Sequence, residues 1–446
     1  MAKRILIVSH HFYPDAEVGA KRMSELARYL CSEAYEVVVV AARPPCGDKV
    51  DPALRLDSSN LRHIWMPQPL KLLPFLLPRI KLLLARGRGD RQGTAPHPVV
   101  PAENDKESLL RRLRRAYLSL EWLIDDKKLW ATLVAVRLLG FAFAKPFDAV
   151  ISSGPPMSTH LAVLLARPVL RGRWIIDLRD PWCDQDQRSN VQTKLSRQLG
   201  RWFEARAVAV ADAVTVTTPS YKQLLCQRYS EKREQIQLVL NGFDGEVEAL
   251  PPPCGKLYLL YAGSLYYNRD PFPLLRGIRE LVNRPDVDRS RVMVRLVGDC
   301  QSWNGASVAS WIEENGLQDC VVIHPRVPAA EVGALLAEAN VLINFAQAQP
   351  MQIPAKMFDY LAARREVLLI TEPYSDTAWL ARQTGCARIV PPGDEAAMSA
   401  TLASLYHDYV EAPQNLKLSS TPSLTAFSRR AQSEKFVDLL QGGEHR

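Results

Sequence analysis

Short runs of apolar residues recur along the chain and predict buried strands of a parallel sheet. The first run is followed by a helical stretch in which Met23, Leu26, Ala27 and Leu30 recur at the spacing of one helix face. Apolar runs without polar alternation are typical of strands covered on both faces, so the first half predicts consecutive βαβ units. The strands predicted in this half cover residues 5–8, 37–40, 149–151, 174–176 and 213–216.

The second half repeats the pattern after a run of three prolines at 251–253, which we interpret as an interdomain linker. Its predicted strands cover residues 257–261, 292–297, 320–323, 341–343 and 367–370. Two such series predict an α/β protein with two Rossmann-like, doubly wound domains that face each other across a cleft. We place these domains at residues 1–240 and 241–425, followed by a C-terminal helix and tail at 426–446.

Residues 67–126 interrupt the alternation of predicted strands and helices and form an irregular insertion in the first domain. Blocks of apolar and basic residues alternate there, and prolines interrupt any long helix. A segment of this kind can touch an anionic membrane surface and bring a lipid-linked acceptor to the protein. It can equally be a partly buried insertion, and the sequence leaves both interpretations open.

Composition narrows the class of protein. The 446 residues suit two domains, and an apolar content of 47% supports well-buried cores. We identify no membrane span, no signal peptide and no metal-ligand spacing among the eight cysteines, so we expect a cytoplasmic protein, free or at the inner face of the membrane. The net charge of +8 comes from dispersed basic residues without an aromatic–basic module, which argues against nucleic acid as a partner.

Ligands of doubly wound sheets bind at the carboxyl ends of the strands, so the loops after the strands hold the candidate residues. Gly19 follows the first strand at a helix start, where free backbone N–H groups can hold an anion. His160 follows the strand at 149–151, as a general acid–base group or as a structural helix histidine. Asp177, Arg179 and Asp180 follow the strand at 174–176, where they pair with one another or meet a ligand.

The second half offers cationic candidates in equivalent loops. Gly263 and Ser264 end the strand at 257–261, and Arg269 precedes the next helix, where its guanidinium can grip a phosphate. Lys356 lies in the first turn of a later helix, and Asp359, one turn on, can accept hydrogen bonds from ribose or sugar hydroxyls. This set suits a nucleotide diphosphate, and we expect neither a metal ion nor another cofactor.

In this order the motifs resemble family 4 of the retaining glycosyltransferases, which have the GT-B architecture. The resemblance covers nearly the whole chain except residues 67–106. It rests on HHFYP through Gly19 to Arg22, SGPP at 153–156, DLRDPW at 177–182, NGFD at 241–244, YAGSL…RDP at 261–271 and IPAKMFDYLA at 353–362. The segments at 153–156 and 177–182 are similar to a bacterial branch involved in surface-polysaccharide assembly.

The resemblance implies a glycosyltransferase that moves a sugar from a nucleotide-sugar donor to an acceptor with retention of configuration. Arg269 falls where the family carries a diphosphate-binding lysine, and Asp359 falls on the second acid of its Glu-x7-Glu motif. Ser264 falls where many members carry arginine, and Met351 replaces the first acid. These departures keep open a non-catalytic homologue that binds a sugar nucleotide. A sugar-nucleotide epimerase on the same architecture is a further alternative.

Overall fold

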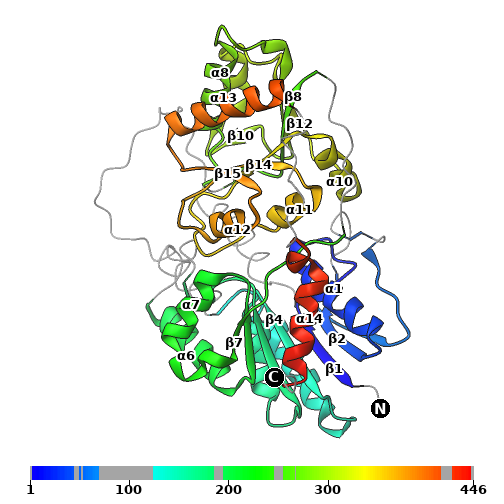
Figure 1. Ribbon diagram of the computed structural model, residues 1–446. Helices are drawn as coiled ribbons and strands as arrows, with labels where there is room; N and C mark the ends of the chain where they lie inside the picture. The colour runs from blue at the N-terminus through cyan, green and yellow to red at the C-terminus, as the bar shows by residue number, and fades with distance from the viewer. Residues whose placement is uncertain are drawn as a thin grey trace, which may run out of the picture. The chain divides into compact units, whose positions relative to one another are not determined.

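The computed structural model describes residues 3–44, 50–51, 54–69, 124–184, 194–245, 255–266, 268–412 and 424–442. Most of the insertion predicted at 67–126 lies outside these ranges, as does the predicted linker at 251–253. The described chain forms two parallel sheets with helices between their strands, which confirms the predicted pair of α/β domains (Figure 1). It divides into two compact units, residues 1–177 with 181–212 and residues 178–180 with 213–446.

The first sheet has seven strands. They are β1 (Arg4–Ser9), β2 (Glu36–Ala42), β3 (Leu61–Met66), β4 (Ala149–Gly154), β5 (Arg173–Leu178), β6 (Ala213–Val216) and β7 (Ile236–Leu238), in the order β3-β2-β1-β4-β5-β6-β7. β1 pairs in parallel with β2 and with β4, and Ile5 lies opposite Val37 on one side and Ala149 on the other. The strand order reverses between β1 and β4, so the topological switch point of this sheet lies at their carboxyl ends.

The second sheet has six strands. They are β8 (Leu257–Ala262), β9 (Val292–Val297), β12 (Val321–His324), β13 (Val341–Phe345), β14 (Glu366–Ile370) and β15 (Ala387–Val390), in the order β12-β9-β8-β13-β14-β15. A two-stranded hairpin, β10 (Ser302–Trp303) and β11 (Ala306–Ser307), follows β9. The order reverses between β8 and β13, so the switch point of this sheet lies at the ends of these two strands.

Helices connect the strands of both sheets. The first part of the chain has α1 (Val18–Ser32), α4 (Lys128–Leu139), the 3-10 helix η2 (Gly140–Phe143), α5 (Ser158–Ala166), α6 (Lys194–Val210), α7 (Pro219–Arg228) and η4 (Ser230–Gln235). The second part has α8 (Phe272–Val282), η5 (Arg289–Arg291), α9 (Val308–Glu314), α10 (Ala329–Glu338), α11 (Ala355–Ala363), α12 (Asp376–Thr384), α13 (Glu395–Glu411), η7 (Leu424–Phe427) and α14 (Arg429–Leu440). None of the helices in the described ranges is long and apolar enough to cross a membrane.

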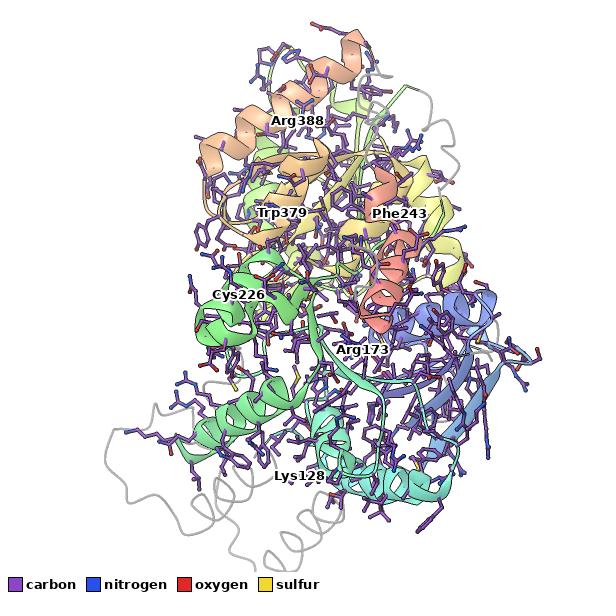
Figure 2. All side chains as sticks on the ribbon, turned by 60° about the horizontal axis from the view of Figure 1, so that its bottom comes forward. Lys128, Arg173, Cys226, Phe243, Trp379 and Arg388 are labelled. Carbon is purple, nitrogen blue, oxygen red and sulfur yellow. The ribbon has the colours of Figure 1, made fainter. Side chains whose placement is uncertain are left out.

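Both faces of the second sheet are buried. Alternate residues of β8 enter two separate cores, with Leu259 in one and Leu260 in the other. Ile278 of α8 packs in the first core, and Phe358 of α11 packs in the second. A side-chain bond joins two strands of this sheet: Nε of Arg388 on β15, labelled in Figure 2, donates to the carboxylate of Glu366 on β14 at 3.0 Å.

The last helix packs against the segment that follows β7. Arg429 of α14 pairs with Asp244 at 2.7 Å, and the side-chain oxygen of Gln432 accepts from the backbone N–H of Leu240 at 2.9 Å. Phe243, labelled in Figure 2, forms a bridge with Ser428. The residues around the domain boundary expected at 240 are therefore fixed by the C-terminal helix, within the second unit.

Two glycines bring the ends of β8 and β9 into close contact. Gly298 has a φ of +126°, and a Cβ there would lie 2.3 Å from the carbonyl oxygen of Gly263. The backbone N–H of Gly298 also donates to His324 at the end of β12, at 3.0 Å. Backbone cannot yield as a flexible side chain can, so this crossing requires a residue without a side chain.

We expect Gly298→Ala to lower the free energy of unfolding by about 2 kcal/mol or more, because of the strained φ and the backbone clash. Gly333→Ala in α10 is the matched control, since a Cβ there meets no atom within 4 Å. It should leave stability unchanged or raise it by up to about 1 kcal/mol, because alanine favours helix. Urea unfolding of both variants measures the difference, and equal stability would contradict the inferred close approach.

Candidate functional site

The carboxylate of Asp177 is fully buried at the carboxyl end of β5 and is held by two other elements. Arg22 of α1 donates to it from Nη2 at 2.9 Å and from Nε at 3.2 Å. The hydroxyl of Ser153, at the end of β4, donates at 2.7 Å. Both bonding partners of Asp177 are distant from it in the chain. Asp177 therefore joins α1, β4 and β5, which indicates a positioning role.

His160 is also fully buried, at the start of α5. Its Nδ1 lies 2.9 Å from the hydroxyl of Ser152, which in turn accepts from the indole of Trp174 at 2.9 Å. The ring centroid lies 5.4 Å from that of Trp182, and a Cβ on Gly154 would come within 2.6 Å of Nε2. This packing favours the structural interpretation of His160, while an acid–base role stays a prediction.

The loop after β1 holds two histidines and leads into α1. Burial, helped by the neighbouring charge of His11, lowers the pKa of His10 to about 3, so this ring is neutral at neutral pH. His11 Nδ1 lies 2.7 Å from a carboxylate oxygen of Asp15. Gly19 is the second residue of α1, which confirms the predicted helix start. That the helix start holds an anion remains a prediction.

In the second unit, Lys356 extends from the first turn of α11 to the end of β8. Its ammonium donates to the carbonyl of Ala262 at 3.0 Å and lies 4.2 Å from the centroid of the Tyr261 ring. A Cβ on Gly263 would lie 2.3 Å from this Nζ, so the glycine makes room for the ammonium. Burial, and then the nearby charge of Arg269, lowers the pKa of Lys356 to about 7.

Arg269 approaches the same strand end from the loop before α8. Its guanidinium donates to the carbonyl of Ser264 at 3.3 Å and stacks over the ring of Tyr266 at 4.0 Å. The side chain is 6% exposed, and its Nε has no partner among the described residues. In the described part of the chain neither Arg269 nor Lys356 forms an ion pair. Two adjacent cations without a carboxylate partner suit a bound anion.

Sequence reasoning missed a third cation at this edge of the sheet. Arg326 follows β12 and pairs with Asp299, which follows β9, through Nε at 2.9 Å. Its Nη2 donates to the hydroxyl of Ser264 at 3.3 Å. The bond from Arg326 lowers the pKa of Asp299. The rule that selected Arg269, a cation in the loop after a strand, would also have selected Arg326.

Arg179 and Asp180 belong to the second unit, whereas Asp177 belongs to the first. The side-chain amide of Gln352 donates to Asp180 at 3.2 Å, and the hydroxyl of Thr217 donates to the carbonyl of Arg179 at 2.6 Å. Gln352 lies in the loop that leads into α11. Asp180 is thus bonded to the loop that positions the Lys356 helix.

The remaining donor-side candidates lie on or beside α11. Asp359 is half-buried one turn after Lys356, and its charge raises the pKa of that lysine, against the effect of burial. The main-chain carbonyl of Met351 accepts from the hydroxyl of Thr218 at 3.1 Å. Arg364 ends the helix with a φ of +51°, in the left-handed region that glycine usually occupies.

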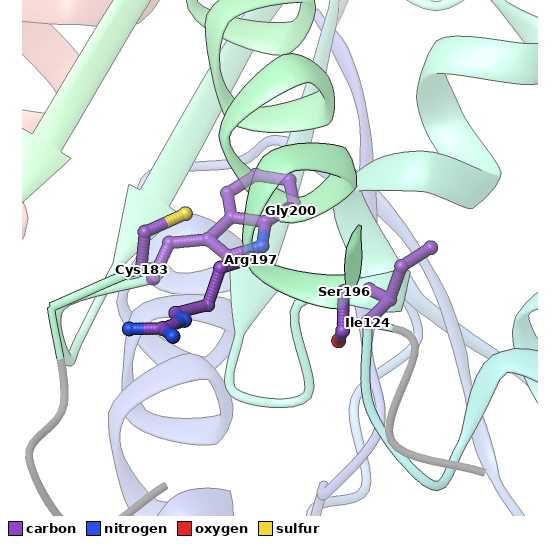
Figure 3. Close-up of a pocket in the computed structure, with 6 residues that line it drawn as sticks. Ile124, Cys183, Ser196, Arg197 and Gly200 are labelled. Atoms are coloured by element: carbon purple, nitrogen blue, oxygen red, sulfur yellow. The ribbon is translucent and has the colours of Figure 1, made fainter. Parts of the chain in front are cut away.

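The described residues offer no further metal site, and one small hollow does not suit a substrate. Among the described residues no group of three or more His, Cys, Asp or Glu side chains is arranged to hold a metal ion. A hollow in the first unit has a volume of about 10 Å³, which suits a single water molecule and no substrate. It is lined by Ile124, Trp182, Cys183, Ser196, Arg197 and Gly200 (Figure 3).

A family model described as a glycosyl transferase 4-like domain matches residues 19–242, half of the chain. The chain belongs to this glycosyl transferase 4-like family. The match begins at Gly19 and includes His160, Asp177, Arg179 and Asp180. The predicted family is thereby confirmed, while retention and the surface-polysaccharide branch stay predictions.

A relative of this glycosyl transferase 4-like chain is the D-inositol 3-phosphate glycosyltransferase of Arthrobacter sp. (strain FB24), 27% identical over 151 residues. The match spans 31% of this chain and only 35% of that relative.

Solved structures match over nearly the full length. Sucrose-phosphate synthase from Thermosynechococcus elongatus has a TM-score of 0.62 at 14% identity, covering 99% of this chain and 98% of that one. WaaG, a glycosyltransferase involved in lipopolysaccharide biosynthesis, has a TM-score of 0.55 at 13% identity, covering 98% and 100%. The structure described as trehalose-6-phosphate from E. coli bound with UDP-2-fluoro glucose has a TM-score of 0.58 at 11% identity, covering 98% and 99%. At these identities the likeness shows a common fold.

We expect Asp177→Asn to lower the free energy of unfolding by about 3 kcal/mol, because it leaves the buried guanidinium of Arg22 without its counter-charge. Asp57→Asn is the matched control, since Asp57 pairs with Arg55 at 3.2 Å with both side chains mostly exposed. The control should change stability by less than about 1 kcal/mol. If urea unfolding gives Asp177→Asn the stability of the control while turnover is lost, Asp177 acts in the chemistry and not in the fold.

Proposed function

We propose that this protein is an enzyme that transfers a sugar from a nucleotide-sugar donor to an acceptor. The observation that carries the proposal is the meeting of Lys356 and Arg269 around Gly263, at the ends of β8 and α11. Both cations lie at the switch point of the second sheet. This location supports the proposal, because ligands of doubly wound sheets bind there. The donor diphosphate would lie against these two cations.

Catalysis would rest on neutralising the leaving group. As the sugar departs, negative charge develops on the diphosphate, and prearranged cations stabilise that charge more than they stabilise the donor. Arg326, which pairs with Asp299, would offer hydrogen-bond donors beside Ser264. Asp359 would accept hydrogen bonds from ribose or sugar hydroxyls. Backbone N–H groups near Gly263 would complete this anion site, and Gly19, at the start of α1, stays a separate candidate for binding the donor.

The sugar and acceptor side would be lined by the loop after β5. We assign Arg179 and Asp180 to this side, with Asp180 coupled to the donor helix through Gln352. Asp177 would act indirectly, because its buried carboxylate fixes Arg22 and Ser153. His160 would support the same loop through its packing on Trp182.

The finer points of the proposal follow the family resemblance. We propose retention of configuration, without a metal ion, in a cytoplasmic protein that contributes to polysaccharide assembly. The acceptor would be lipid-linked or a polysaccharide, and residues 67–115 would contact an anionic membrane at its inner face. Most of that segment lies outside the described residues. The neighbour with bound UDP-2-fluoro glucose supports a nucleotide-sugar donor, and WaaG supports a role in surface polysaccharide.

We expect Arg269→Met and Lys356→Met each to weaken binding of the nucleotide-sugar by about tenfold or more, because each removes one positive charge from the diphosphate. Isothermal titration with UDP-, GDP- and ADP-sugars measures the affinities. Arg284→Met is the control, since Arg284 pairs with Asp286 on the surface at 2.9 Å. Unchanged binding in both site variants would reject the donor site.

Product analysis separates the alternatives to a transferase. Mass spectrometry with a panel of acceptors should detect a glycosylated product. An altered donor sugar without any acceptor would indicate an epimerase. Tight binding that depends on Arg269 and Lys356, without turnover of any donor, would indicate a non-catalytic homologue.

We expect the affinity for the nucleotide-sugar to fall by about tenfold between pH 6 and pH 8.5, because Lys356 with a pKa of about 7 loses its charge over this range. The diphosphate of a nucleotide-sugar is a diester and stays fully ionised over this range, so the loss reports the protein. Lys356→Arg keeps its charge and should bind with little dependence on pH. An equal fall of affinity in both proteins would contradict the role of Lys356.

A further inference from the structure

Three buried polar atoms lie on or beside the loop that joins β13 to α11, residues 346–354. They are Oε1 of Gln347, Oε2 of Glu372 and Nε of Arg269, and none of them has a hydrogen-bond partner among the described residues. A buried donor or acceptor without a partner costs free energy, so native proteins rarely keep several of them in one place. A cluster of such atoms therefore points to a polar ligand.

Gln347 follows β13, one of the two strands at the switch point of the second sheet. The residue is 5% exposed, and its Nε2 donates to the carbonyl of Asp270 at 3.3 Å. A carbonyl only accepts, so this bond fixes which end of the amide is the nitrogen. Asp270 directly follows Arg269 in the chain, so Gln347 lies beside the loop that carries a donor-site cation. Its Oε1 is left to accept a bond from a ligand.

Glu372 follows β14, the strand that pairs with β13. Its Oε1 accepts from the backbone N–H of Ala348 at 2.8 Å. This bond holds the carboxyl group against the loop, one residue after Gln347. Its other oxygen, Oε2, is buried and is a second acceptor without a partner in the described chain. The ends of two adjacent strands therefore each present one unpaired acceptor beside the same loop.

The third atom, Nε of Arg269, is a donor in the loop after β8. The guanidinium bonds the carbonyl of Ser264 through Nη1 at 3.3 Å and stacks on the ring of Tyr266, and neither contact uses Nε. β8 also pairs with β13, so the three unpaired atoms follow three neighbouring strands. One donor and two acceptors suit a ligand whose groups both donate and accept, and hydroxyl groups do both.

We propose that Gln347 and Glu372 accept hydrogen bonds from hydroxyl groups of the donor sugar and thereby select the sugar. The inference rests on the proposed function, because it takes the diphosphate to lie against Arg269 and Lys356. The sugar is joined covalently to that diphosphate, so its hydroxyls lie next to the phosphate. A sugar oxygen would accept from Nε of Arg269. The preferred donor would carry free hydroxyls at these positions, in place of deoxy or acylated carbons.

Buried acceptors of this kind discriminate between sugars more sharply than an apolar wall does. A sugar without the matching hydroxyl leaves the acceptor both desolvated and unpaired in the complex, so the loss exceeds that of one exchange with water. A nucleoside diphosphate without a sugar has no such hydroxyl, so its affinity should not depend on Gln347 or Glu372. This difference separates sugar selection from the binding of the diphosphate by Lys356 and Arg269.

Isothermal titration with UDP, GDP and ADP, and with the glucose, galactose and mannose esters of each, tests the proposal. We expect Gln347→Met and Glu372→Gln each to weaken binding of the best-bound sugar ester by about tenfold, because each removes one acceptor at similar side-chain size. Binding of the same nucleotide without a sugar should change by less than about twofold.

Matched controls carry the same changes away from this loop. Gln235→Met removes another buried Oε1 without a partner in the described chain, in η4 before β7. Glu395→Gln alters a half-exposed carboxylate that pairs with Arg276 at 2.7 Å. Both controls should bind the sugar esters and the free nucleotides as the unaltered protein does.

Deoxy analogues of the best-bound sugar ester give a test on the unaltered protein, which does not depend on how the variants fold. At least one analogue should bind about tenfold more weakly, and Gln347→Met or Glu372→Gln should be insensitive to the loss of that same hydroxyl. Equal binding of every analogue would overturn the proposal. An equal loss of sugar esters and free nucleotides in both variants would also overturn it, and water would then be the partner of these atoms. Failure of the unaltered protein to bind any nucleotide would reject the proposed function itself, and this inference with it.

Discussion

The ammonium group of Lys356 occupies the space that a side chain at residue 263 would need. The packing at the carboxyl edge of the second sheet therefore depends on glycine at this position. Because residue 263 is glycine, the ammonium of Lys356 can reach the end of β8 from the first turn of α11. Because residue 298 is also glycine, the end of β9 can pack on the carbonyl of Gly263. The ends of these two strands therefore meet more closely than residues with side chains would allow. The ammonium donates to a carbonyl and lies over an aromatic ring, and burial favours its neutral form.

At the end of β5, in the first unit, neighbouring protein groups compensate the buried charge. There the buried carboxylate of Asp177 receives bonds from Arg22 and Ser153, so protein groups satisfy it. At the end of β8, Lys356 and Arg269 meet carbonyls and aromatic rings, and their charges are not compensated by an ion pair in the described chain. A compensated charge stabilises a fold, whereas an uncompensated pair of cations gains most from an anion that arrives later. This difference is the physical reason to assign the donor to the second unit.

The sequence predicted those parts of the fold that depend on local pattern. Continuous apolar runs identified the central strands, because strands covered on both faces contain few polar residues. The edge strands β3 and β7 were missed, since LRHIWM and IQL mix polar and apolar positions. Gly263, Arg269 and Lys356 could be predicted from their places after strands and at helix starts. The bond between Arg22 and Asp177 could not, because it joins residues that only the sheet order brings together.

The sequence of helix α4 does not determine which side of the helix is buried. KLWATLVAVRLL is apolar enough for a core helix, and nothing in its spacing distinguishes the side that packs on α5 from the side that faces water. The fold makes that distinction, because it buries Trp130 and leaves Val136 exposed. Burial of apolar surface is the main force that drives folding, so a face that stays outside the core is free to bind something else.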